Sequence, residues 1–335
     1  MILRKQIIGM VASIAILTSC SGQTKQLEMN TSKKENNPLL CDPQLGMCEV
    51  NTTSQPDSTK LKAKADNNKI QIIYFTDPIC SSCWGIEPQL RKLKLEYGES
   101  IEIEYRMGGL LPDWSYNSGG ISKPSDVAHH WDEVSIYYDM PIDGDLWLED
   151  PLHSSYPPSI AFKAAQMQDK QKAILFLREI REMVFLEKKN ITKWEHLEEA
   201  GKKSGLDTDQ FKVDYEGHAK SLFEGDLKLA QEYGVRGFPT LLFVDSLGSK
   251  EIVYGSKPYT VFEQALFKSY SKARKKEYDK SWQSLFAKHN SLTAREFSEL
   301  ALKPRKEAET ILNDLVNQGQ LEKQTTKNGS LWILR

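Results

Sequence analysis

Two cysteines separated by two serines are the clearest candidate for chemistry in this chain, Cys80-Ser81-Ser82-Cys83. The β-branched and apolar run 69–75 and the turn formers 76–79 precede them, and apolar residues at helical spacing follow. This order predicts a strand, a turn and a helix that begins at about Cys80. At a helix N-terminus, free N–H groups and the helix dipole stabilise a thiolate. We therefore predict that Cys80 attacks a disulfide and that Cys83 resolves the resulting mixed disulfide.

The arrangement of the cysteines favours redox chemistry over a structural framework or a zinc site. The chain has five, and none follows Cys83, which excludes an even scatter of structural disulfides. A CxxC pair can be half of a zinc site, but no second CxxC and no nearby histidine pair completes four ligands. The adjacent His129 and His130 would face different directions on a helix, and we interpret them as ordinary surface or lid residues. We expect neither a metal nor an organic cofactor.

The first 20 residues are typical of a lipoprotein-type export signal. A basic start precedes the apolar run 7–17, which is too short to span a membrane, and residues 17–20 resemble a bacterial lipobox. The lipobox implies cleavage before Cys20 and acylation of its thiol, which would anchor the protein to a membrane. An ordinary signal peptide with an incidental cysteine, or a short N-terminal anchor, is the alternative. Export would place the protein in the cell envelope, facing the periplasm or the outer surface, where disulfides persist.

Residues 21–68 are polar and predict a flexible linker. Within it, Cys41 and Cys48 flank the turn formers Pro43 and Gly46, so the two thiols can close a small loop. The pair is either a local staple or a second redox pair on a mobile arm. About 20 flexible residues follow Cys48, and their mean span of roughly 25 Å would let the pair reach across a small domain.

Seven segments share a pattern with one protein family. They are Phe75–Trp84, Glu87-Pro88, Leu93–Gly98, Ala161–Ala165, Phe176–Arg178, Lys188–Thr192 and Pro239-Thr240. On these segments, the chain from about residue 70 to its C-terminus resembles the DsbA-like branch of the thioredoxin superfamily. More narrowly, it resembles the SpxH (YjbH) adaptor family and its FrnE-like relatives. The resemblance implies an α/β thioredoxin fold with an inserted helical domain, and a dithiol that can be oxidised.

Pro239 and Asp77 are the other residues expected beside the dithiol. In thioredoxin-like folds a cis-proline at the position of Pro239 holds the preceding backbone open for antiparallel pairing with an extended substrate. X-Pro is the bond that can be cis, and a proline is tolerated at a strand start, although an ordinary loop proline is the alternative. Asp77 either tunes the thiol pKa or caps the turn before Cys80.

The predicted elements give a DsbA-like domain over 69–275, with a helical insertion at about 115–225. Its further predicted strands are 101–107, the run after Pro239 and 250–254, and its predicted helices are 158–168, 172–186, 193–204, 226–233 and 261–270. Right-handed β-α-β connections and an inserted lid are compatible with this order.

Residues 280–335 predict a separate small unit that resembles a winged helix. Its expected elements are helices 281–289, 292–301 after a cap at Ser291, and 305–317, then a hairpin around Asn328-Gly329. Nucleic-acid binding usually needs a clear basic excess, whereas the whole chain has a net charge of -2. We therefore expect a protein-docking or structural role and no nucleic acid.

Together these patterns predict an enzyme, a DsbA-like thiol–disulfide oxidoreductase that exchanges disulfides with protein substrates in the cell envelope. Its expected partners are protein thiols and disulfides, a redox partner protein, and the membrane through the N-terminal lipid. Ser81-Ser82 match neither the Gly-Pro of reducing thioredoxins nor the Pro-His of the oxidising DsbA type. The direction of exchange therefore stays open.

Two other functions are compatible with the same residues. One is an SpxH-like adaptor or interaction protein that uses the DsbA-like fold to bind a client. The resemblance implies that such adaptors are cytosolic and deliver a transcription factor to a protease, whereas the export signal and the Cys41/Cys48 pair depart from this pattern. The other is an isomerase or a glutathione-transferase-like relative, which commonly lacks the second cysteine or has serine at the first position.

Overall fold

The computed structural model describes residues 41–42, 46–49, 69–115 and 123–335. The predicted export signal, with Cys20, and most of the predicted linker lie outside the described residues. Within the described ranges, no helix combines the length and apolar character needed to cross a membrane.

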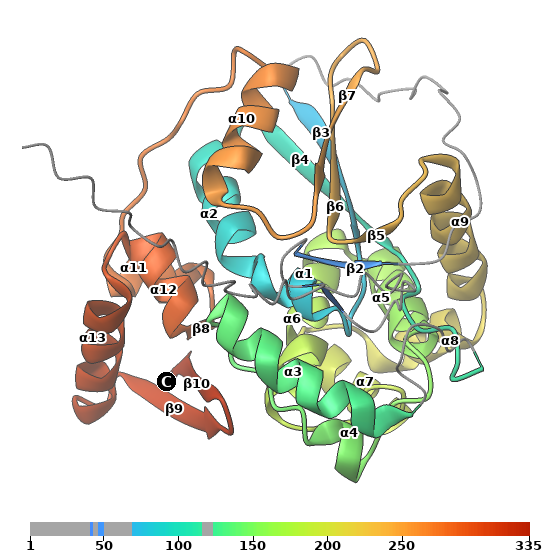
Figure 1. Ribbon diagram of the computed structural model, residues 1–335, viewed down its shortest axis with the longest axis horizontal. Coiled ribbons are helices and arrows are strands. Elements are labelled where there is room, and N and C mark those ends of the chain that lie inside the picture. The colour runs from blue at the N-terminus through green and yellow to red at the C-terminus, as the bar shows by residue number, and fades with distance from the viewer. Residues whose placement is uncertain (1–40, 43–45, 50–68, 116–122) are drawn as a thin grey trace, which may run out of the picture. The chain divides into compact units, whose positions relative to one another are not determined.

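A four-stranded sheet lies at the centre of the fold, with the strand order β4-β3-β6-β7 (Figure 1). Its members are β3 (Ile70–Thr76), β4 (Ile101–Met107), β6 (Thr240–Val244) and β7 (Lys250–Tyr254). β3 runs parallel to β4 and antiparallel to β6, and β7 is antiparallel to β6. Apolar runs predicted β3 and β6, both faces of which are buried, whereas alternation of apolar and polar residues predicted β4.

The helix that follows the dithiol is broken in two, where the sequence predicted one. Ile86 separates α1 (Ser81–Gly85) from α2 (Glu87–Tyr97), and Pro88 lies in the first turn of α2. Proline has no N–H to donate to the carbonyl four residues earlier, so it interrupts the helix. α10 (Tyr259–Ser269) packs on β6, β7 and α2 (Figure 1).

Helices 124–138, 146–149 and 208–216 were not predicted individually, but the described chain between β4 and the next described strand is mostly helical, as expected of the insertion, and contains seven helices. They are α3 (Pro124–Tyr138), α4 (Leu146–Glu149), α5 (Tyr156–Gln168), α6 (Lys170–Leu186), α7 (Trp194–Lys203), α8 (Thr208–Glu216) and α9 (Ala219–Glu232). α9 is about twice as long as the predicted helix 226–233. On α3, His129 is exposed and lies 3.2 Å from Glu133, but His130 is buried, so its interpretation as a surface residue was wrong.

A second small sheet joins the N-terminal part of the chain to the core. It contains β1 (Cys41–Asp42), β2 (Met47–Glu49) and β5 (Gly237–Phe238), in the order β1-β2-β5. We call the β1–β2 hairpin the arm. The sequence predicted neither the arm strands nor β5, because strands of two or three residues are too short to show a periodic pattern.

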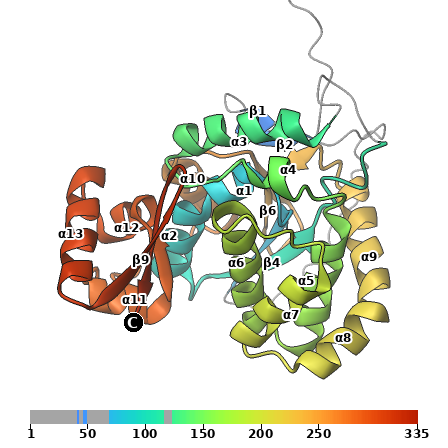
Figure 2. The ribbon, with the colours of Figure 1, turned by 90° about the horizontal axis from the view of Figure 1, so that it is seen from below.

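The C-terminal part contains three helices and a three-stranded sheet in the order β8-β10-β9. Its red and orange ribbons lie beside one another in Figure 2. The elements are α11 (Trp282–Lys288), β8 (Ser291–Thr293), α12 (Ala294–Ala301), α13 (Arg305–Asn317), β9 (Leu321–Thr326) and β10 (Gly329–Leu334). The predicted cap at Ser291 was wrong, because Thr293 caps α12 in a capping box with Glu296. These elements surround a hydrophobic cluster of their own, and α12 packs on α2. The winged-helix identity stays a prediction.

Candidate functional site

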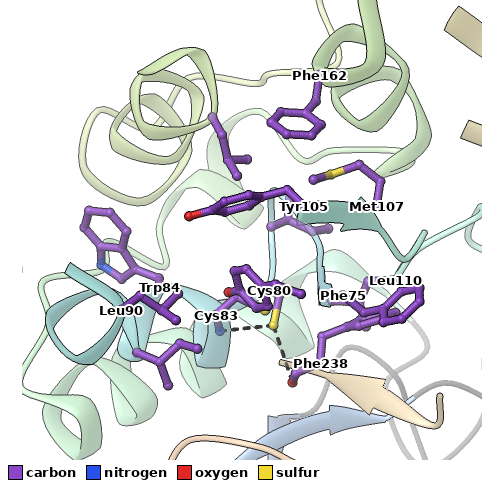
Figure 3. Close-up of a cluster of buried hydrophobic side chains, with 14 of the residues drawn as sticks. Phe75, Cys80, Cys83, Trp84, Leu90, Tyr105, Met107, Leu110, Phe162 and Phe238 are labelled. Carbon is purple, nitrogen blue, oxygen red and sulfur yellow. Dashed lines mark hydrogen bonds between the residues drawn. The ribbon is translucent and has the colours of Figure 1, made fainter. Parts of the chain in front are cut away.

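The two cysteines of the CxxC motif lie at the start of α1, where the sequence placed them. Cys80 is the N-cap residue, and the backbone N–H of Cys83 donates to its Sγ at 3.2 Å (Figure 3). Both cysteines are buried and neither is in a disulfide. A pair of free thiols one helical turn apart can close into a disulfide, so the geometry permits the predicted exchange.

Pro239 lies beside this pair, as the thioredoxin-like resemblance implies. The Phe238–Pro239 peptide bond is cis. The Cys80 thiol is 3.7 Å from the carbonyl oxygen of Phe238, which belongs to β5 (Figure 3). The edge of a two-residue strand therefore lies next to the first cysteine.

The arm pairs with this edge and brings a third sulfur to the site. β2 is antiparallel to β5, with Cys48 opposite Phe238 and Glu49 opposite Gly237. The Sγ of Cys48 lies 3.3 Å from the Sγ of Cys80, and Cys48 is disulfide-bonded. In the hairpin register, Cys41 of β1 stands opposite Cys48. The structure thus joins the two cysteine-containing segments that the sequence could only place within reach of each other.

Asp77 organises the turn before Cys80. Its carboxylate accepts hydrogen bonds from the N–H of Ile79 (3.0 Å), the N–H of Leu110 (2.7 Å) and the hydroxyl of Ser155 (2.9 Å). Burial raises the pKa of Asp77 to about 6, although these hydrogen bonds oppose the rise. The capping alternative matches this geometry, and tuning of the thiols stays a prediction.

Arg181 of α6 is a buried cation beside the dithiol that the sequence analysis missed. Its guanidinium donates to Thr76 Oγ1 at 2.6 Å and pairs with the Glu87 carboxylate at 2.6 Å. One signal could have identified it. Arg181 lies four residues after Leu177 and three before Val184, so a charged residue interrupts the apolar face of a helix.

The electrostatics of the dithiol differ from the expectation of a stabilised Cys80 thiolate. Burial raises the pKa of the Cys80 thiol well above its usual value, although the N–H of Cys83 opposes the rise. Burial also acts to raise the pKa of Cys83, but its hydrogen bond with Cys80 and the charge of Arg181 outweigh that effect and lower it. The expectation was wrong for the docked arm because Cys80 is fully shielded from water there.

Metal ligation has no geometric support in the part of the chain that is described. No three His, Cys, Asp or Glu side chains are grouped there in a way that could hold an ion.

Comparison with known proteins establishes the family. Residues 74–264 match the family described as thioredoxin. The ClpXP adapter protein SpxH of Halalkalibacterium halodurans is 35% identical over 305 residues, which cover 88% of this chain and 97% of that protein. The chain belongs to the SpxH family. The SpxH protein of Bacillus subtilis is 29% identical over 268 residues, covering 78% of this chain and 88% of the relative.

A solved structure of another protein shares the fold of this SpxH-family chain. A putative protein disulfide isomerase from Nitrosomonas europaea superposes with a TM-score of 0.53 over 60% of this chain and 97% of the other, at 20% identity. At that identity the likeness supports the fold alone. The SpxH relatives, which are named as ClpXP adapter proteins, confirm the family predicted from the sequence.

Proposed function

We propose that this protein binds an extended segment of a protein client along the edge of β5, as an interaction protein of the SpxH type. The arm provides the observation that carries this proposal, because β2 already pairs with β5 in antiparallel register. Main-chain hydrogen bonds to a sheet edge give affinity for many sequences, and neighbouring side-chain pockets give specificity. A client strand would occupy the place of β2 once the arm leaves.

Gly237 is the residue of β5 that permits this close approach. A Cβ atom added there would lie 2.4 Å from the carbonyl oxygen of Cys48, which is closer than real contacts allow. Gly237→Val is therefore expected to exclude any strand from the edge. Gly225 of α9 is the control, since apart from its chain neighbours and the helix backbone no atom lies within 4 Å of an added Cβ.

The names of the relatives suggest the test. The protein is added to purified ClpXP with the client of the Bacillus subtilis SpxH protein, and that SpxH protein serves as the positive control. We expect faster degradation of the client with the wild type and with Gly225→Ala, and no acceleration with Gly237→Val. Absence of both acceleration and direct client binding in the wild type would count against the adapter function.

Thiol–disulfide exchange with protein substrates is the second candidate function. The specific observation in its favour is the 3.3 Å separation between the Cys80 sulfur and the sulfur of disulfide-bonded Cys48. Its partners would be protein disulfides and a redox partner protein. Turnover of a protein disulfide should disappear in Cys80→Ser, and full activity in that variant would exclude the mechanism.

The cellular location is a further part of the proposal. We propose export and lipid attachment at Cys20, supported by the apolar run 7–17 and the lipobox-like residues 17–20. Such a location suits a redox-active disulfide. It would direct client binding toward proteins of the cell envelope.

A further inference from the structure

The arm occupies the client edge in the manner of a bound substrate. Two contacts hold the arm. β2 pairs with β5, and the N–H of Ser256 donates to the carbonyl of Gly46 at 2.5 Å. Gly46 has a φ of 68°, a conformation that glycine adopts without strain, and an added Cβ there would meet the backbone of Ser256 at 2.7 Å. The close contact between the arm and Ser256 therefore requires a glycine at position 46.

The docked arm aims a disulfide at the first cysteine of the motif. Cys48 is fully buried, and its sulfur lies 3.3 Å from Cys80 Sγ and 3.6 Å from Ser82 Oγ. A separation of about 3 to 3.5 Å between reacting atoms is that of a near-attack arrangement. A strand that acted only as a staple or cover would not need its sulfur at this point.

We propose that the arm is an internal redox partner of the CxxC pair, and that exchange between the two pairs controls access to the β5 edge. This inference rests on the thiol–disulfide exchange proposed above. The other half of the arm disulfide is assigned to Cys41, which stands opposite Cys48 in the hairpin.

The exchange is balanced and needs no outside oxidant. Cys80 loses its proton as its sulfur attacks Cys48 Sγ, the Cys48–Cys41 bond breaks, and Cys41 leaves as a thiolate that takes up that proton. Cys83, after losing its proton, then attacks Cys80 Sγ, and Cys48 leaves as a thiolate that takes up that proton. Two electrons have moved from the CxxC pair to the arm, so that the former is oxidised and the latter reduced.

The consequence concerns the client edge. In the reduced arm no disulfide closes the hairpin. The unfolded arm then has more conformational freedom, so the folded hairpin is less stable. The arm would then leave β5 more readily, and a client strand would compete for the same edge. The redox state of the arm thereby regulates client binding.

The test uses the full-length chain with Cys83→Ser, in which the second step is blocked. After acid quenching, peptides are mapped by mass spectrometry without reduction. We expect a Cys48–Cys80 linked peptide in Cys83→Ser and in Cys83→Ser/Gly225→Ala. The link should be lost in Cys83→Ser/Gly237→Val, where the arm cannot dock.

A small aromatic disulfide reagent separates failure of this inference from failure of exchange itself. If Cys80 of Cys83→Ser reacts with the reagent but never links to Cys48, the internal relay is overturned while exchange stands. If Cys80 never links to Cys48 and also fails to react with the reagent in Cys83→Ser/Gly237→Val, where the arm cannot shield it, both are overturned.

A second measurement avoids the substitution at Cys83. In wild-type protein with an oxidised arm and a reduced CxxC pair, a Cys80–Cys83 disulfide should appear as arm thiols appear, at a rate independent of protein concentration. A rate proportional to concentration would show exchange between molecules and would overturn the proposal.

Discussion

The buried carboxyl group of Asp77, in the turn before the dithiol, makes the stability of the folded protein depend on pH. Its pKa is raised to about 6 by burial, so the folded protein retains the proton to a higher pH than the unfolded chain does. Stability from this group is therefore present at low pH and falls as pH rises from about 4 to about 6. The difference from the ordinary value amounts to about 3 kcal/mol.

Asp77→Asn tests this coupling. The variant cannot ionise, so the decline in the free energy of unfolding between pH 4 and pH 6 should become shallower by up to about 3 kcal/mol. Urea unfolding at several pH values measures it. A slope equal to that of the wild type would contradict the assigned pKa.

Arg181 is expected to contribute both to stability and to the thiols. Arg181→Met leaves the Glu87 carboxylate without its 2.6 Å partner in a largely buried place, which should cost about 3 to 5 kcal/mol. The pKa of Cys83 should rise, because the cation that lowers it is gone. Urea unfolding and thiol alkylation against pH measure the two effects.

Two substitutions serve as controls for Arg181. Arg295→Met removes a more exposed cation 3.6 Å from Glu299 and should cost less than about 1 kcal/mol. Arg181→Lys keeps the charge and should restore a low pKa of Cys83, at least in part. An unchanged Cys83 pKa in Arg181→Met would contradict an effect of Arg181 on the thiols.

Among single residues, the sequence predicted those whose position follows from their near neighbours in the chain. Cys80 and Cys83 are three residues apart, and their position on α1 follows from the adjacent strand and turn. Arg181 contacts Thr76 across about a hundred residues of chain, and only its place on an apolar helix face indicates it. The burial of Cys80, which raises its pKa, could not be read from the motif, and neither could the 3.3 Å contact of its sulfur with Cys48 of the arm.

At the scale of elements, a buried ion cluster joins the C-terminal part to the core. Glu296 of α12 is fully buried, accepts hydrogen bonds from Arg178 of α6 at 2.8 and 3.1 Å, and lies 3.2 Å from Arg91 of α2. Its carboxylate also accepts from the N–H of Thr293 in the capping box. The cluster therefore stabilises both α12 and its attachment to α2 and α6.

Glu296→Gln should destabilise the protein by about 3 to 5 kcal/mol, because two buried arginines lose their shared anion. Glu309→Gln is the control, because this partly exposed residue pairs with Arg305 at 2.9 Å and its loss should cost less than about 1 kcal/mol. Urea unfolding and limited proteolysis near residues 270–290 measure the difference. Equal stabilities would contradict a structural role for the cluster.

Most long periodic elements were predicted, although the 15-residue helix α3 was missed, and short ones were not predicted. Strands β3, β4, β6 and β7 and most helices have enough residues to show their period. β5 and β8 have two and three residues, and both form because partner strands from distant parts of the chain pair with them. The break at Ile86 was missed although Pro88 signalled it.

At the scale of the whole molecule, the α/β thioredoxin fold and its inserted helices followed from the order of elements and the family resemblance. Function did not follow as directly, because a strand edge beside a dithiol is compatible with strand binding and with disulfide exchange. The relatives named as adapters favour the first. The 3.3 Å contact between Cys48 and Cys80 favours the second.

Location is a property of the whole chain and has its own test. If Cys20 is acylated, wild-type protein expressed in bacteria should incorporate labelled palmitate and sediment with membranes, and Cys20→Ala should do neither. Labelling of both proteins, or of neither, would exclude lipid attachment at Cys20.

The central claim is that β5 is a binding edge for an extended chain. A fluorescent peptide of residues 39–50 with serine at both cysteine positions is titrated against full-length Cys41→Ser/Cys48→Ser protein, and binding is followed by anisotropy. Saturable binding is expected in that parent and with an added Gly225→Ala, and loss of binding with an added Gly237→Val. Equal affinity of the Gly237→Val protein and its parent would contradict the account.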